Sequence, residues 1–136
     1  EYQPLKLEVV SADKMVMQCD VVNVIARTSE GDIGILPGHE PLMAALVPCM
    51  VEIVVAEGRT EILAIDGGLL AVAQGHVRVL SHEVKLAEEI FLEEARREAH
   101  ELRHIRSEGG ATDDQIHRLH ILNAQIRAGE KYQASR

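Results

Sequence analysis

Apolar and polar residues alternate along residues 5–81, the first part of the chain. A period of two is typical of β-strands because successive side chains point to opposite faces of a sheet. Two turn-forming pairs, Glu57-Gly58 and Gln74-Gly75, separate apolar runs and predict hairpins. The pattern predicts an all-β sandwich of about ten short antiparallel strands. The expected strands lie at 5–9, 15–26 (two strands or one bent strand), 51–56, 60–65, 69–73 and 76–80, and the segment 41–47 fits either a strand or a helical turn.

The apolar period changes to 3.6 residues after Val84, which indicates amphipathic helices. A first helix is expected at 85–107, and a pair of glycines ends it. Thr112 and Gln115 form the T-x-x-Q pattern of a capping box, which predicts a second, antiparallel helix that ends near Gly129. The residues expected on the apolar faces are Ala87, Phe91, Ala95, Leu102 and Ile105 in the first helix, and Ile116, Leu119, Leu122 and Ile126 in the second.

The change of period divides the chain into two predicted units, a β-sandwich at 1–84 and a helical hairpin at 85–136. The formal net charge of −8 argues against nucleic acid and anionic lipid as partners, because both require a basic surface. The chain has two Tyr, one Phe and no Trp, so it offers no platform for stacked bases and the sandwich core must be aliphatic.

Two features predict a soluble protein in a reducing compartment. Cys19 and Cys49 sit among apolar neighbours at no motif spacing, which predicts two buried thiols rather than a disulfide. No apolar run approaches the length of a membrane span, and no signal peptide is evident.

One segment, residues 29–41, concentrates glycine and proline and cannot form one regular element. Its alternating apolar residues predict a short strand, and its glycines and prolines predict a shaped surface loop. The polar side chains that this segment is expected to present are those of Glu30, Asp32, His39 and Glu40.

His100, Glu101 and His104 form the H-E-x-x-H signature of zinc peptidases on the first predicted helix. Two histidines at positions i and i+4 share a helix face and suit one metal ion. Both lie opposite the apolar stripe, however, and a third protein ligand is needed, while His117 and His120 belong to the other helix. A zinc-dependent peptidase is therefore the alternative interpretation and not the favoured one.

Glu93, Arg96 and Arg103 in the first predicted helix suit a nucleotide, with arginine for phosphate and a carboxylate for ribose or base. The same residues also suit an ordinary solvated face with Glu–Arg pairs. The residues alone leave both interpretations open.

Four strings occur in order along nearly the whole chain: V-V-S-A-D-K (9–14), S-E-G-D-I-G-I-L-P-G-H-E-P-L (29–42), I-D-G-G-L-L-A-V (65–72) and V-R-V-L (77–80). Followed by a helical hairpin, they resemble the epsilon-subunit family of F-type ATP synthases. The string at 29–42 is the most specific part of the resemblance.

The resemblance implies a non-catalytic rotor subunit in the central stalk of a proton- or sodium-translocating ATP synthase, at the cytoplasmic face of the bacterial inner membrane. The sandwich is then expected to couple the gamma subunit to the membrane ring of c subunits. The hairpin is expected to permit turnover when folded against the sandwich. When extended toward the alpha and beta subunits, it is expected to inhibit ATP hydrolysis. Neither an enzymatic activity, a required cofactor, a metal nor a nucleic-acid partner is expected.

The resemblance also implies roles for particular residues. Weak regulatory binding of ATP is expected at Glu93, Arg96 and Arg103, because the segment matches the family motif I/L-D-x-x-R-A loosely, with Glu93 in place of Asp and Arg97 in place of Ala. The residues expected to contact the stalk and ring are Glu30, Gly31, Asp32 and His39. The residues expected to contact acidic segments of the catalytic subunits are Arg106, Arg118, Arg127 and Lys131.

Overall fold

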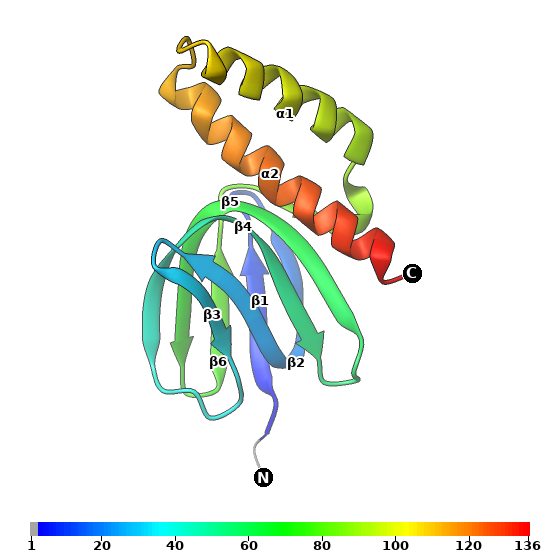
Figure 1. The fold of residues 1–136 in the computed structure, drawn as a ribbon. Helices are drawn as coiled ribbons and strands as arrows, with labels where there is room; N and C mark the ends of the chain where they lie inside the picture. Colours follow the sequence, from blue (N-terminus) through cyan, green and yellow to red (C-terminus); the bar gives the residue numbers. More distant parts are fainter. Residues whose placement is uncertain (1–2) are drawn as a thin grey trace.

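The computed structural model describes residues 3–136, so the first two residues of the predicted sandwich unit lie outside the described part. A β-sandwich is followed by two packed helices, as the sequence predicts (Figure 1). The elements are β1 (Leu5–Val10), β2 (Met15–Thr28), β3 (Gly31–Ile35), β4 (Leu42–Val55), β5 (Thr60–Ala73), β6 (His76–Leu80), β7 (Val84–Leu86), the 3₁₀ turn η1 (Ala87–Glu89), α1 (Leu92–Ser107) and α2 (Asp113–Ala134).

The described strands form one seven-stranded sheet that closes on itself, because β1 pairs with both β2 and β6. The order around the closed part is β1-β6-β5-β4-β2, with β3 added beside β2 and β7 beside β5. The pairing of β1 with β6 is parallel, which corrects the expectation of antiparallel strands throughout. The other described pairs are antiparallel.

Seven described strands take the place of about ten predicted ones, because β2, β4 and β5 are each 14 residues long. β4 and β5 each run through segments that the sequence pattern separates, and β2 is the single bent strand that the pattern allowed. The predicted strands 60–65 and 69–73 are one strand, β5, and the ambiguous segment 41–47 belongs almost entirely to β4. Shifts of register bend β2, including one between Ile25 and Thr28. The bent strand pairs with β1 along its first half and with β3 along its second half.

The sandwich core is aliphatic, as the composition predicts, and no aromatic side chain of the described residues belongs to it. Cys49 is buried in this core, Cys19 packs partly buried against it, and both are free thiols. The largest fully buried side chains include Leu5, Leu7, Ile35, Ile53, Leu63, Ile65 and Leu70.

The I-D-G-G string at 65–68 lies where β5 crosses closely over the end of β6. Gly68 has a φ of +139°, and a Cβ there would stand 2.0 Å from the carbonyl oxygen of Leu80. The buried hydroxyl of Ser81 lies 2.6 Å from the Gly67 carbonyl oxygen and 2.8 Å from the Asp66 carboxylate. The Asp66 carboxylate also accepts the Glu83 N–H at 3.0 Å, so this string has a structural role.

The first helix begins at Leu92 rather than near residue 85, because Val84–Leu86 forms β7 and Leu86 pairs with Leu63 of β5. The sheet therefore continues past the predicted boundary between the two units. Phe91 precedes the helix and is 72% exposed, which corrects its placement on the apolar face. The residues of α1 that are buried are Leu92, Ala95 and Ala99.

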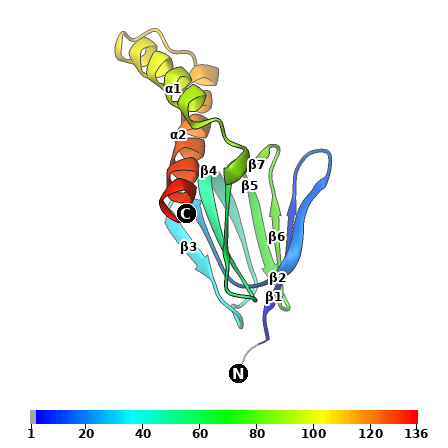
Figure 2. The same ribbon diagram turned by 90° about the vertical axis from the view of Figure 1, so that its right-hand side faces the viewer.

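The second helix begins as predicted with a capping box, in which Thr112 and Gln115 exchange hydrogen bonds. It continues beyond Gly129 to Ala134, because α2 lies between α1 and the sandwich and is buried on both sides (Figures 1 and 2). Gly129 does not end the helix. It allows a close approach instead, since a Cβ there would stand 3.1 Å from Leu92 Cδ1.

Candidate functional site

The hairpin docks on the sandwich mainly through α2, which packs against β4 and β5, while α1 packs on α2. Part of the buried interface is a small cluster that is separate from the sandwich core. Ile121, Ala124 and Gln125 of α2 are also buried on this side. Among the described residues, one ion pair joins the two units, between Lys131 Nζ on α2 and Glu52 Oε1 on β4 at 3.2 Å. The clustered residues are Ile62, Ala64, Ala87 and Ala128, with Met50, Ile90 and Tyr132 packed against them.

A cavity of about 290 Å³ lies beside this interface, between α2 and the strands β2, β3 and β4. Arg27 Nε donates a hydrogen bond to Asp32 Oδ1 at 2.8 Å on its sandwich wall, and Arg127 of α2 lines the opposite side. The hydrogen bond from Arg27 lowers the pKa of Asp32, and the positive charge of Arg127 lowers it further. Cys49 also lines the cavity, and burial raises the pKa of its thiol.

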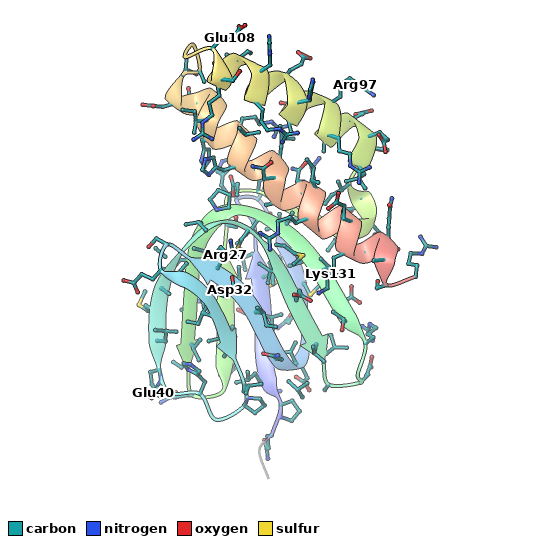
Figure 3. The ribbon with its side chains drawn as sticks, viewed as in Figure 1. Arg27, Asp32, Glu40, Arg97, Glu108 and Lys131 are labelled. Carbon is teal, nitrogen blue, oxygen red and sulfur yellow. The ribbon has the colours of Figure 1, made fainter. Side chains whose placement is uncertain are left out.

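The residues predicted to meet the membrane ring lie at two different places. Glu30, Gly31 and Asp32 form the β2–β3 turn and the start of β3, and Asp32 lines the cavity beside α2. His39 lies in the loop after β3, where its Nδ1 is 2.7 Å from the Glu40 carbonyl oxygen. Figure 3 shows Asp32 near the hairpin and Glu40 at the opposite end of the sandwich. The structure therefore separates His39 from the other three, and their contact with a ring remains a prediction.

A groove of about 640 Å³ runs between the two helices. Arg96 and Arg103 both line it from α1, so one groove contains two of the residues predicted to bind a nucleotide. Glu93, the third, is bonded to Arg96, whose Nη1 donates to Glu93 Oε2 at 2.8 Å. Arg96 Nη2 donates to Glu130 Oε2 on α2 at 2.9 Å. The remaining residues that line the groove are His100, Asn123, Ile126 and Arg127.

The basic residues of the hairpin differ in their partners. Arg118 donates two hydrogen bonds to Glu98 of α1, at 2.8 and 3.1 Å, and these bonds raise the pKa of Arg118. Lys131 is paired with the sandwich, whereas Arg127 and Arg106 have no carboxylate at ion-pair distance within residues 3–136. Two of the four residues predicted to meet the catalytic subunits are therefore engaged in this conformation.

The H-E-x-x-H residues do not form a metal centre with other side chains. His100 lines the groove between the helices, and His104 Nε2 lies 3.5 Å from Glu108 Oε2 near the end of α1. Across the described part of the chain, no three His, Cys, Asp or Glu side chains converge as metal ligands would.

Sequence reasoning missed four charged residues of these sites: Arg27, Glu52, Glu98 and Glu130. Glu52 of β4 binds Lys131 of α2, which only the docking of the hairpin brings near it. The partner of Arg27 is five residues away, across the β2–β3 hairpin, and a predicted hairpin at this turn is the signal that would reveal it. Glu98 and Glu130 bind residues of the other helix, 20 and 34 positions away, and no local pattern marks such pairs.

Residues 4–87 match the family model described as the ATP synthase, Delta/Epsilon chain, beta-sandwich domain. The chain belongs to the ATP synthase delta/epsilon family. An ATP synthase epsilon chain from Cutibacterium acnes is 43% identical, over 94% of this chain and 93% of its own length. An ATP synthase epsilon chain from Nocardia farcinica is 32% identical, over 93% and 91%.

Solved structures agree with this assignment. A chain of the Euglena gracilis mitochondrial ATP synthase has a TM-score of 0.73 at 26% identity, covering 99% of this chain and 82% of its own. A chain of the Tetrahymena thermophila mitochondrial enzyme has a TM-score of 0.59 at 14% identity, covering 97% and 98%, and shows the same fold.

The epsilon chains of this family are non-catalytic subunits, so the zinc-peptidase interpretation of His100, Glu101 and His104 is rejected. None of the helices between residues 3 and 136 has the length and apolar character needed to cross a bilayer.

Proposed function

We propose that this chain is a rotor subunit in the central stalk of a proton- or sodium-translocating ATP synthase, where it couples the gamma subunit to the membrane ring. The 43% identity to a bacterial epsilon chain supports this role. The related Tetrahymena chain comes from a structure described as the central stalk and c-ring. Because the relatives are bacterial, we place the subunit on the cytoplasmic face of the inner membrane, attached through the complex.

We further infer that the hairpin is a detachable brake on ATP hydrolysis. The observation that carries this proposal is that the hairpin docks through a small cluster of its own, with Ala64, Ala87 and Ala128 among its buried residues. A switch needs two dockings of similar free energy, and a shallow interface beside an independent core meets that requirement. None of the buried residues of the sandwich core belongs to α1 or α2, so the sandwich supplies every side chain of its own core.

Detachment changes which basic residues are available to acidic partners. Undocking frees Lys131 from Glu52 on β4 and removes Arg127 from the cavity wall. Arg118 stays paired with Glu98 because both belong to the hairpin. We therefore expect Lys131, Arg127 and Arg106 to meet acidic segments of the alpha and beta subunits. Arg118 would do so only after its bond to Glu98 opens.

The groove between the helices is the proposed site for regulatory ATP. Arg96 and Arg103 line it, and guanidinium groups form strong charge-assisted bonds with phosphate. A nucleotide bound there contacts both helices, so it stabilises whichever state keeps them packed. Weak binding is expected, because Glu93 and Glu130 already occupy Arg96.

The deciding experiment compares an assembled ATP synthase carrying the full chain with one carrying residues 1–89. This truncation keeps β7 and η1, whereas cutting after Val84 would remove strand residues that pair with β5. We expect retained assembly with gamma and faster ATP hydrolysis in the truncated complex. Equal hydrolysis rates in the two complexes would contradict the brake, and loss of assembly with gamma would contradict the sandwich as the docking unit.

A further inference from the structure

The groove between α1 and α2 has different electrostatics at its two ends. At one end Arg96 is bonded to two carboxylates, Glu93 of its own helix at 2.8 Å and Glu130 of the other helix at 2.9 Å. Toward the other end, Arg103 Nη1 has only the neutral amide oxygen of Asn123, at 3.5 Å. Arg127 has no carboxylate partner within ion-pair distance among the described residues. The arginine at the Glu130 end of the groove is therefore neutralised by carboxylates, whereas Arg103 at the other end has no carboxylate partner among the described residues.

Glu130 stands where an oxyanion of a ligand would bind Arg96. Glu130 lines the groove, and its carboxylate is bonded to Arg96, which lines the groove as well. A carboxylate oxygen and a phosphate oxygen form the same kind of charge-assisted bond with a guanidinium group. The hydrogen bond from Arg96 to Glu130 raises the pKa of Arg96, and the bond to Glu93 acts in the same direction.

We propose that Glu130 is an internal substitute for an anionic ligand: it holds the Arg96 end of the groove closed, and a phosphate-bearing ligand enters there only by displacing it. The inference rests on the nucleotide-binding role proposed above for the same groove. It adds that the chain itself lowers the affinity of the groove for phosphate-bearing ligands, because the Glu130 carboxylate competes with them for Arg96.

Displacement of Glu130 is energetically accessible. The side chains of Arg96 and Glu130 are 41% and 52% exposed, and exposed ion pairs contribute little to stability. A polyphosphate carries several oxyanions and reaches Arg103 and Arg127 as well, whereas Glu130 bonds only to Arg96. The net free energy of binding is the difference between the ligand's contacts with Arg96 and those that Glu130 gives up. The wild-type chain therefore binds the ligand weakly, and a chain without this carboxylate binds it more tightly.

The hairpin contains a matched control for this proposal. Glu98 and Arg118 also form an ion pair between α1 and α2, but neither residue lines the groove. Replacing either glutamate removes one negative charge and one interhelical ion pair. Only Glu130→Gln also frees a guanidinium inside the groove.

The test is calorimetric titration of the full chain at low salt, as wild type, Glu130→Gln and Glu98→Gln, with ATP, inorganic tripolyphosphate and adenosine. We expect Glu130→Gln to bind ATP and tripolyphosphate roughly three- to fivefold more tightly than wild type, the upper part of the range for an exposed ion pair. Glu98→Gln should stay within twofold of wild type, and adenosine should respond to neither change. Thermal unfolding checks that both variants remain folded to the same extent.

Three outcomes would overturn the role of Glu130: no gain in the Glu130→Gln chain, an equal gain in Glu98→Gln, or no binding of phosphate ligands by any form. The last also contradicts the nucleotide site, whereas the first two leave it standing. The brake is judged separately, by the hydrolysis rates of the truncated complex, so its failure is distinguishable from the failure of this inference.

Discussion

Lys131 Nζ lies 3.2 Å from Glu52 Oε1, and this ion pair joins the last turns of α2 to the final residues of β4. Figure 3 shows Lys131 on the last turns of α2, where the helix passes over the sandwich. The small buried cluster around Ala128 adjoins the pair. Docking of the hairpin therefore combines a shallow apolar contact with one charge pair.

Reversing one charge of this pair is expected to favour the undocked hairpin. Lys131→Glu replaces the ion pair by two neighbouring carboxylates. An exposed ion pair contributes about 0.2–1 kcal/mol, so the fraction of chains with an undocked hairpin should rise roughly two- to fivefold. The measurement is the rate at which Cys49 reacts with a thiol reagent in a Cys19→Ala background, because Cys49 is 5% exposed and lines the cavity beside α2.

The double variant Lys131→Glu with Glu52→Lys is the control, since it restores opposite charges at the same positions. It should return Cys49 to the wild-type rate. Equal rates in the single variant and the wild type would show that the ion pair does not hold the hairpin.

A larger residue at position 129 is expected to push α2 away from Ile90 and Leu92, which lie just before and at the start of α1. A Cβ at this position would stand 3.1 Å from Leu92 Cδ1 and 3.7 Å from Ile90 Cγ2. Gly129→Ala is tolerated by small movements of Leu92, whereas Gly129→Leu cannot fit without moving α2. Cys49 should therefore react faster in Gly129→Leu than in Gly129→Ala. Identical rates in the two variants would contradict the close approach.

Substitution of Gly68 is expected to destabilise the sandwich itself. A Cβ at this position would stand 2.0 Å from the Leu80 carbonyl oxygen, and the φ is +139°. Gly68→Ala should therefore lower the free energy of unfolding by more than about 2 kcal/mol. Gly58→Ala is the matched control, because Gly58 has a φ of +106° but open space around it, and its cost should be nearer 1 kcal/mol. Urea unfolding measures both, and equal losses would refute the steric explanation.

The hairpin is expected to lose stability in acid through Glu98. The hydrogen bonds from Arg118 lower the pKa of Glu98 in the folded chain below the usual value for a glutamate. A lowered folded pKa gives stability that is complete above the unfolded pKa and disappears as pH falls through the folded one. Unfolding free energies between pH 6 and about 3 should thus fall less steeply for Glu98→Gln than for wild type. Parallel curves for the two chains would contradict this linkage.

Some features of the fold follow from short stretches of sequence. Alternation along residues 5–81 predicts the β-sandwich, and the pattern of Thr112 and Gln115 predicts the start of α2 to the residue. These signals are local, because a strand face repeats every two residues and a helix cap involves neighbours within one turn. The ends of elements are less well predicted. Leu86 belongs to the sheet only because Leu63 of β5 lies beside it.

The candidate sites also contain some features that local sequence predicts and others that depend on the tertiary structure. Arg96 and Arg103 lie one above the other on a helix, so a helical period suffices to predict that they share a groove. The partner of Arg96 on α2 is 34 residues away, and its position depends on how the two helices cross. The burial of α2 on two sides, including Ala124 and Gln125, likewise depends on its place between α1 and the sandwich.

The sequence by itself determined the family, the aliphatic sandwich, the helical hairpin and the residue types available at each surface. Only the tertiary structure decided that Lys131 binds Glu52, that Glu130 binds Arg96, and that Phe91 stays outside the packed helix. The physical reason is the range of the interactions. Period, turns and caps arise between residues close in the chain, whereas ion pairs and the burial of a helix face arise between elements that only the complete fold brings together.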